Sequence, residues 1–237
     1  MFTVLYDNYE GREELQTAWG FSCLVTGTPQ TILFDTGGDG EILLRNMDCL
    51  GVEPGAVDTL VLSHEHWDHT GGLMDFLAEN PAVKVYLPGV FSEAMKDEIK
   101  GTGAELVETR EATRLCPGVL TTPVLGGPTP EQALCVRTVE GPVVLTGCAH
   151  PGIAELVEAA GQACGESVRA AMGGFHLKDA WGTEVNATIA RLKELGVQQA
   201  GPSHCSGEET RKKMAEAFGD DYIDLAVGVR VDMEPAR

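Results

Sequence analysis

The amino-acid sequence predicts an α/β protein, or α+β under some schemes, in which helices pack on the faces of β-sheets. Short apolar runs rich in β-branched residues alternate with amphipathic stretches over most of the 237 residues. Glycine, which favours tight turns, occurs 29 times. No linker rich in Pro and Ser interrupts this pattern, so we expect one domain over residues 1–237.

Strands are predicted where apolar and β-branched residues cluster between turn residues. These segments are 2–6, 21–26, 31–34, 59–62, 83–87, 105–107, 134–138, 143–146, 170–172 and 223–226. Helices are predicted where apolar residues recur on one face, as Val185, Ile189 and Leu192 do. These segments are 41–50, 72–79, 92–99, 153–163, 184–195 and 208–218. Pro and Gly are dense between residues 116 and 130, which predicts a loop there.

The chain is strongly acidic: 17 Lys and Arg against 36 Asp and Glu give a formal net charge of −19. Charge of this sign repels phosphate backbones and anionic lipid surfaces, so we expect neither nucleic acid nor a membrane as a partner. The longest uncharged stretch, 17–34, is interrupted by glycine and proline and does not resemble a membrane span. Asp7 and Glu10 lie where a signal peptide needs a basic and then apolar start, so we expect a cytoplasmic protein.

The seven cysteines form no C-x-x-C pair and are expected to be reduced thiols. Cys148 and Cys205 stand close to histidines, so these two remain candidates for lining a site.

All six histidines lie in short junctions after apolar, strand-like runs, where a rigid scaffold presents chemically active side chains. The segment 64–69 reads His-Glu-His-Trp-Asp-His, which places three imidazoles and an aspartate close together. Imidazole nitrogen and carboxylate oxygen are ligands for Zn²⁺ and also for Fe or Mn. A catalytic zinc site has three protein ligands and one position left for water. The alternative is that these polar groups merely satisfy a turn.

Residues 63–72 resemble the H-x-H-x-D-H signature of the metallo-β-lactamase superfamily, and His150 and His204 stand where that family has two further histidines. The segment 32–37 looks like the family's early strand and turn, which ends in a buried structural aspartate, here Asp35. The resemblance implies a four-layer αβ/βα metallo-β-lactamase-type sandwich, with metals at one edge between two facing sheets.

The resemblance also implies two sets of metal ligands. The first set is His64, His66 and His150, and the second is Asp68, His69 and His204. The expected cofactor is a pair of divalent ions, two Zn²⁺ in the first instance, with Fe or Mn as alternatives. Metal binding lowers the pKa of water from about 15.7 to about 7, which supplies a hydroxide nucleophile at neutral pH. Asp68 is the expected catalytic group that orients this water and exchanges its proton.

The sequence departs from the family where most binuclear members have a bridging aspartate after a late strand. The matching region, 172–177, reads Met-Gly-Gly-Phe-His-Leu, so His176 stands where a carboxylate is expected. Two divalent cations (+4) held by neutral histidines and one aspartate (−1) leave a formal charge of about +3, which attracts anionic substrates and weakens retention of the second metal. We expect His176 to be a catalytic residue that contacts the substrate or its oxyanion. Metal ligation and a satisfied core histidine are the alternatives.

These residues predict a metallo-β-lactamase-superfamily hydrolase that uses a metal-bound hydroxide on an ester, lactone or phosphoester bond of a small anionic molecule. The segments 19–23, 35–40, 147–152 and 174–177 resemble a subgroup labelled dihydropterin-ribofuranosyl-aminobenzene phosphate synthases. That resemblance implies the alternative of a pterin-type synthase using the same metals as Lewis acids. A metal-stabilised binding protein without turnover is a third interpretation, and the sequence leaves the oligomeric state open.

Overall fold

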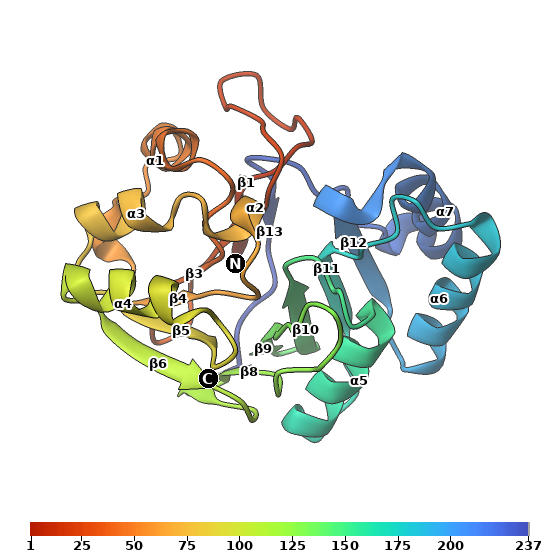
Figure 1. The fold of residues 1–237 in the computed structure, drawn as a ribbon. Coiled ribbons are helices and arrows are strands. Elements are labelled where there is room, and N and C mark those ends of the chain that lie inside the picture. The colour runs from red at the N-terminus through yellow and green to blue at the C-terminus, as the bar shows by residue number, and fades with distance from the viewer. Residues whose placement is uncertain (237) are drawn as a thin grey trace.

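The computed structural model describes residues 1–236 and consists of two β-sheets that face each other, with helices on the outer side of each sheet (Figure 1). The strand order is β13-β1-β2-β3-β4-β5-β6 in the first sheet and β12-β11-β10-β9-β8-β7 in the second. Helices α1, α3 and α4 cover the first sheet, and α5, α6 and α7 cover the second (Figure 1). The layers therefore run helix, sheet, sheet, helix, which confirms the predicted four-layer sandwich.

The first half of the chain builds most of the first sheet. Its strands are β1 (Phe2–Tyr6), β2 (Ser22–Val25), β3 (Ile32–Phe34), β4 (Thr59–Val61), β5 (Lys84–Pro88) and β6 (Glu105–Thr109), joined at the sheet edge by β13 (Arg230–Val231). Its helices are α1 (Gly40–Cys49), α2 (Trp67–Thr70), α3 (Leu73–Glu79) and α4 (Glu93–Thr102), with the 3-10 turn η1 (Pro54–Ala56). β1 to β3 pair antiparallel, whereas β3 to β6 are parallel and need the helical crossovers between them.

The second half repeats this plan. Its strands are β7 (Arg114–Cys116), β8 (Val119–Thr121), β9 (Leu134–Thr138), β10 (Gly141–Thr146), β11 (Ala170–Gly174) and β12 (Gln199–Ser203). Its helices are α5 (Ile153–Cys164), α6 (Gly182–Glu194) and α7 (Glu208–Phe218), with the 3-10 turns η2 (His204–Ser206) and η3 (Gly219–Asp221). β7 to β10 pair antiparallel, and β10 to β12 are parallel.

Strand residues alternate between two apolar layers. In β3, Ile32 and Phe34 point into the core between the two sheets, whereas Leu33 packs under helices α1 and α3. In β10, Leu145 joins the core between the sheets and Val144 packs under α5. Both faces of these strands are buried, which explains why they appear in the sequence as nearly continuous apolar runs.

Side chains fix the ends of the outer helices. The Asp39 carboxylate accepts a hydrogen bond from Ile42 N (3.0 Å) at the start of α1, and Ser92 Oγ accepts one from Met95 N (3.3 Å) at the start of α4. α4 ends at Thr102 and is followed by Gly103, whose φ of 94° is a left-handed conformation that glycine adopts without strain.

The structure corrects several predicted elements. The strand predicted at 223–226 is wrong: Ile223 N donates to Ala200 O (2.9 Å) beside β12, but no ladder continues from it. Two strands missing from the prediction, β7 and β8, lie partly in the segment predicted as a loop. β12, with the sequence Gln-Ala-Gly-Pro-Ser, was also missed, because it is a strand through its pairing with β11 and not through its own propensity. Within residues 1–236, no helix is both long and apolar enough to cross a membrane.

Candidate metal centre

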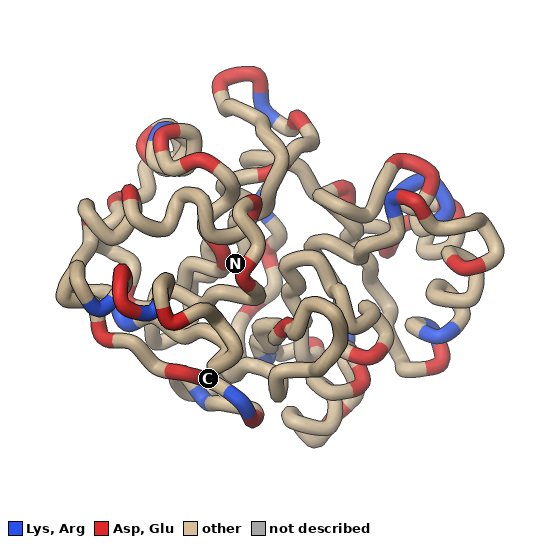
Figure 2. The backbone as a smooth tube through the Cα atoms, in the orientation of Figure 1, with Lys and Arg blue, Asp and Glu red and all other residues tan. Residues whose placement is uncertain are grey.

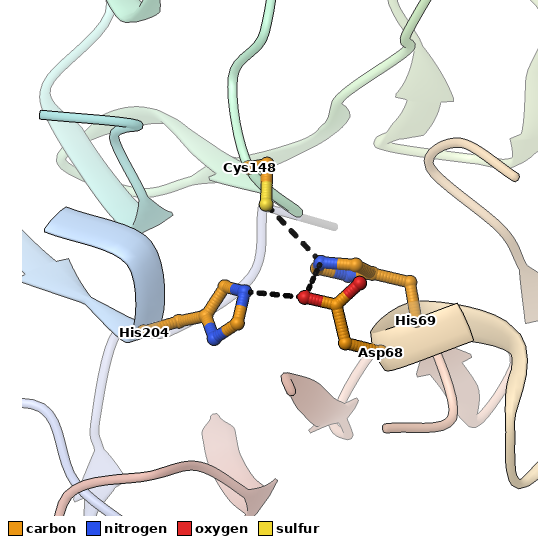
Figure 3. A group of neighbouring side chains, drawn as sticks. All are labelled: Asp68, His69, Cys148 and His204. Carbon is orange, nitrogen blue, oxygen red and sulfur yellow. Dashed lines mark hydrogen bonds and ion pairs between the residues drawn. The ribbon is translucent and has the colours of Figure 1, made fainter. Parts of the chain in front are cut away.

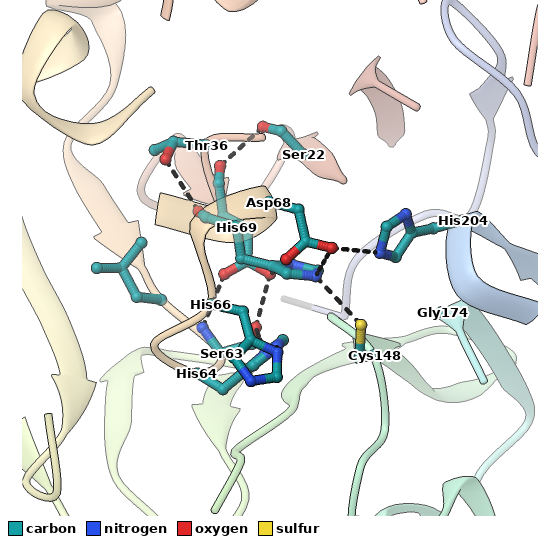
Figure 4. Close-up of polar contacts among 12 residues, drawn as sticks. Ser22, Thr36, Ser63, His64, His66, Asp68, His69, Cys148, Gly174 and His204 are labelled. Atoms are coloured by element: carbon teal, nitrogen blue, oxygen red, sulfur yellow. Dashed lines mark hydrogen bonds and ion pairs between the residues drawn. The ribbon is translucent and has the colours of Figure 1, made fainter. Parts of the chain in front are cut away.

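The histidine-bearing loops follow parallel strands of both sheets. Asp35 follows β3, the segment 63–69 follows β4, and the segment 147–150 follows β10. His176 follows β11 and His204 follows β12. Ligands in α/β proteins bind beyond the carboxyl ends of such strands. The two sheets thus bring their loops together at one edge, as Figure 4 shows for side chains from both halves of the chain.

The structure gathers every histidine of the chain at this edge. Ring centroids lie 4.7 Å apart for His64 and His66 and 4.3 Å apart for His64 and His69. His150 lies 4.7 Å from His66 and 4.2 Å from His176. His204, which comes from the other end of the sequence, has its ring 5.1 Å from that of His69. Such crowding of imidazoles, several of them buried, is the pattern of a metal site and not of an ordinary turn.

The first predicted ligand set converges on His66. Its Nδ1 lies 3.1 Å from His64 Nε2 and 3.2 Å from His150 Nε2. The Ser63 hydroxyl donates to Asp35 Oδ2 (2.7 Å), so the contact between Ser63 Oγ and His64 Nδ1 (2.9 Å) requires the ring to donate. That tautomer leaves the lone pair of His64 Nε2 facing the other two rings.

The pKa values of His64 and His150 favour neutral rings. Burial, followed by the neighbouring imidazoles, holds the pKa of His64 well below its usual range. Burial and then His176 lower the pKa of His150 to about 4. Neutral imidazole is the form that binds a metal, so these two rings are ready for binding at neutral pH.

The second predicted set comes together with one addition. Asp68, His69 and His204 each place a ligand atom within 4.8 Å of one another and of Cys148 Sγ (Figure 3). Asp68 Oδ2 lies 3.2 Å from His204 Nε2 and 3.7 Å from His69 Nε2, and Cys148 Sγ lies 3.2 Å from His69 Nε2. Of these four, only Cys148 was outside the predicted ligand sets; its proximity to His150 in sequence was the one signal for it.

Outer side chains orient the rings of the second set. His69 Nδ1 donates to Asp35 Oδ2 (2.7 Å), and Asp35 also accepts from Ser63 N (2.7 Å). His204 Nδ1 donates to Asn8 Oδ1 (2.9 Å), and Asn8 Nδ2 donates to His204 O (3.3 Å), which fixes the orientation of the amide. Both rings are left with Nε2 pointing at Asp68, which is how outer partners orient metal-binding histidines. The structural role predicted for Asp35 agrees with these contacts.

Asp68 and His69 shift each other's pKa. Burial opposes protonation of His69, but Asp35 and Asp68 outweigh it and raise the pKa to about 9. Burial likewise opposes ionisation of Asp68, but its contacts with His204 and His69 outweigh it and lower the pKa. A cation at His69 Nε2 would take the place of a proton that the surrounding carboxylates already stabilise.

Glu131 is a site residue that the sequence did not indicate. Its buried Oε1 accepts from Cys148 N (3.0 Å) and Ala149 N (2.9 Å), and its Oε2 accepts from His150 N (2.8 Å). Burial raises its pKa to about 7, against the lowering effect of these N–H donors. The carboxylate thus holds the loop that carries His150 and Cys148.

Backbone strain is concentrated in the same loops. Among the described residues, the non-glycine residues with positive φ are Asp35 (56°), Ala149 (61°), His176 (52°) and His204 (49°). Each such residue costs roughly 1–3 kcal/mol and persists only where the surroundings impose it. All of them are site residues or neighbours of site residues. Their strained backbone lowers the stability of the fold but sets the orientation of the site.

The donor atoms fit a metal ion. A tetrahedral ion with bonds of about 2.0–2.3 Å to N, O and S separates its ligand atoms by roughly 3.3–3.6 Å. The two separations from His66 Nδ1, 3.1 and 3.2 Å, and three separations in the second set, 3.2, 3.2 and 3.7 Å, are close to these values, and all ligand atoms of each set lie within 4.8 Å of one another. His204 Nε2 is buried and makes no hydrogen bond within residues 1–236: Nδ1 donates to Asn8, so the Nε2 lone pair faces Asp68 Oδ2 at 3.2 Å, an arrangement that a cation between the two atoms would stabilise.

His176 lies at the entrance to the site. It is exposed, so the interpretation as a satisfied core histidine is wrong. It lines a cavity of about 440 Å³ together with His150 and Arg191, and a second cavity of about 370 Å³ together with Trp19 and Lys178. A hydrogen bond with Cys205 raises its pKa, which favours the charged ring.

Comparison with known proteins identifies the family. Residues 20–188 match the model of the metallo-beta-lactamase superfamily. A protein of Methanocaldococcus jannaschii named 7,8-dihydropterin-6-methyl-4-(beta-D-ribofuranosyl)-aminobenzene-5'-phosphate synthase is 30% identical, over 95% of this chain and 94% of its own length. This relative confirms the predicted likeness to the subgroup of that name.

Solved structures agree. Tm1679, described as a metal-dependent hydrolase of the beta-lactamase superfamily, is 26% identical and superposes with a TM-score of 0.83 over 98% of both chains. The metallo-beta-lactamase fold protein YhfI from Bacillus subtilis shares the fold at 16% identity, with a TM-score of 0.70 over 98% of both chains. The chain belongs to the metallo-β-lactamase superfamily.

Proposed function

We propose that this protein is a metal-dependent hydrolase that cleaves an ester, lactone or phosphoester bond of a small anionic molecule. The observation that supports this most strongly is the pair of adjacent donor sets, whose atoms are spaced as ligands of one ion each. In this proposal His64, His66 and His150 hold one divalent ion, and Asp68, His69 and His204 hold a second. The nitrogen-rich donor set suits Zn²⁺, with Fe or Mn as alternatives.

The metal ligands of the first set and Asp68 have different roles in the proposed reaction. Bound divalent ions supply Lewis acidity that brings water ionisation near neutral pH and polarises the scissile carbonyl or phosphoryl group. Three protein ligands in the first set leave room for water beside His66. Asp68, 9% exposed at its side chain, is ionised in the metal-free site through its contacts with His204 and His69, and a bound cation would keep it so in their place. Its carboxylate orients the attacking water, accepts the proton and returns it to the leaving group.

In our proposal anionic substrates are attracted by the bound metal ions and by His176 and Lys178. This attraction acts against Asp179 and Glu184, which also line the cavities. Acidic residues are spread over helices and loops of both halves (Figure 2), so substrate attraction must come from the site itself. Lys178 lies in the cavity beside His176, with its Nζ 4.6 Å from the ring of Trp19. In our proposal the His176 ring donates to the substrate oxyanion, and Lys178 balances a more distant negative charge.

Replacing His176 by alanine tests its assignment. We expect turnover to fall by a factor of about 10²–10³, as for the loss of one oxyanion donor, with both metal ions retained. Turnover and metal content, measured on the same preparation, separate this role from metal ligation. Loss of one ion from the variant would contradict a substrate contact and make His176 a ligand.

The proposed function is tested by elemental analysis of the purified protein together with a panel of phosphomonoesters, phosphodiesters, carboxylic esters and lactones. We expect two ions per chain, hydrolysis of one class of substrate, and loss of that activity on chelation with recovery on adding Zn²⁺. A protein that holds no metal, or hydrolyses its substrate equally well after complete chelation, would contradict the proposal.

A pterin-type synthase is the second candidate, because the relative with that name is similar over nearly the whole chain. The same ions would then activate a phosphorylated sugar instead of water. A fully metal-loaded protein that is inert to the whole panel but condenses a phosphoribosyl donor with an aminobenzoate would favour the synthase. Inertness in both assays would favour a metal-stabilised binding protein.

A further inference from the structure

The end of β11 has no room for a side chain, and His176, which stands where a bridging aspartate is expected, lies beyond it. β11 ends at Gly174, and a Cβ atom there would lie 2.2 Å from Gly147 O and 2.8 Å from Cys205 Sγ. His176 follows on the exposed rim, beside His150. The second donor set therefore receives no acidic ligand from this strand.

A thiol from the neighbouring loop stands in the second set instead. Cys148 is buried, 3% exposed, and its Sγ lies 3.2 Å from His69 Nε2 (Figure 3). Its backbone N–H donates to Glu131, so the loop that carries it is held in place. On the far side of Asp68, the buried His204 Nε2 is aimed into the same group without a hydrogen-bond partner. These four donors come from three segments, since Asp68 and His69 both lie in α2, and their ligand atoms lie within 4.8 Å of one another.

We propose that the thiolate of Cys148 is the fourth protein ligand of the second metal ion and replaces the missing bridging carboxylate. This inference rests on the proposed function, in which that ion is held by Asp68, His69 and His204. When the metal binds, the S–H bond breaks, a sulfur–metal bond forms and the proton leaves to solvent, with no change of oxidation state. The formal charge of the two-ion site falls from about +3 to about +2, the value that a bridging carboxylate would give.

Two consequences follow for the site. Four protein ligands would fill the coordination positions of the second ion, so the open position for water would belong to the ion of the first set. Thiolate is a soft ligand, so the second position selects Zn²⁺ or Co²⁺ over Mn²⁺ and Mg²⁺.

Cobalt substitution tests the proposal without reference to activity. Metal-free protein is titrated with Co²⁺ while bound metal is counted and the thiolate-to-cobalt charge-transfer absorption is recorded. We expect the wild type to bind two Co²⁺ and to show this band. Cys148→Ser should lose the band, and its affinity for the second ion should fall by more than the ~10–100-fold that loss of an outer-shell partner causes. Cys205→Ser removes the other buried thiol near Cys148, which groups with Cys148 and His176 and not with Asp68, His69 and His204; it should keep both the band and the stoichiometry if Cys148 is the ligand.

The possible outcomes are distinct. Two bound Co²⁺ without a thiolate band in the wild type, or a band that survives in Cys148→Ser and disappears in Cys205→Ser, would overturn the assignment of Cys148 and leave the two-metal site standing. A wild type that binds no Co²⁺ would overturn the proposed function itself. Thermal melting of the metal-free variants shows whether Cys148→Ser folds. If Cys148→Ser does not fold, the assignment of Cys148 is tested instead by the wild-type spectrum. It is also tested by the number of protons that the wild type and Cys205→Ser each release per bound Co²⁺.

Discussion

Replacing His66 by alanine is expected to remove one metal ion per chain and almost all turnover. His66 Nδ1 is the atom that both other rings of the first set approach, at 3.1 and 3.2 Å. A set of two nitrogens holds a divalent ion poorly. The lost ion takes with it several kcal/mol of transition-state stabilisation, which corresponds to a drop in kcat/KM on the order of a thousandfold or more. Elemental analysis and the kinetics of the best panel substrate measure the two effects on the same preparation.

The His66 substitution should leave the fold intact. His66 precedes α2, and its carbonyl accepts from His69 N and Thr70 N, both at 3.0 Å. Alanine keeps these backbone bonds, so we expect the free energy of unfolding of the metal-free protein to change by less than about 1 kcal/mol. Trp67→Ala is the control, because that side chain is 64% exposed and supplies no donor atom to either set. A His66→Ala protein that keeps two ions and normal turnover would show that the first set is not a metal site.

The spacing of residues 64–69 predicted much of this geometry, for a reason that the structure makes clear. His66 has extended backbone angles, φ −104° and ψ 149°, so His64 and His66 point the same way from an extended segment. The next residues form the short helix α2, which turns Asp68 and His69 towards the second set. A local motif thus fixes the direction of four side chains, and local motifs can be read from a sequence.

Contacts between distant segments could not be predicted in this way. Asn8 orients His204 across 196 residues of sequence, and Glu131 binds backbone N–H groups 17 to 19 residues further along the chain. Neither residue lies in a recognisable motif, because a carboxylate or amide from any part of the chain could make these contacts if the fold brought it there. Likewise β12 is a strand through its partner β11, so its own residues, which include Gly201 and Pro202, gave no signal.

Replacing Glu131 by glutamine is expected to have the largest effect on stability. Both carboxylate oxygens of Glu131 accept backbone N–H groups. An amide offers one acceptor and sets an NH₂ group against at least one of these donors, leaving it unpaired and buried. We expect the free energy of unfolding to fall by about 3 kcal/mol, with weaker bonds to the neutral acceptor adding to the unpaired donor. For a chain of this length that corresponds to a melting temperature lower by roughly 6–12 °C.

The Glu131→Gln change should also loosen the metal centre, because His150 and Cys148 depend on this carboxylate for their positions. We expect the affinity for metal to fall by about 10–100-fold, as for other outer partners of metal ligands. Glu111→Gln makes the same substitution at an exposed glutamate and should change neither quantity. Melting curves of the metal-free wild type and Glu131→Gln measure the stability lost with the hydrogen bonds. Competition with a chelator measures the metal affinity lost when His150 and Cys148 are no longer held in position. A variant that melts like the wild type would mean that the three N–H groups find other acceptors, and that the loop is held by its strained backbone and packing instead.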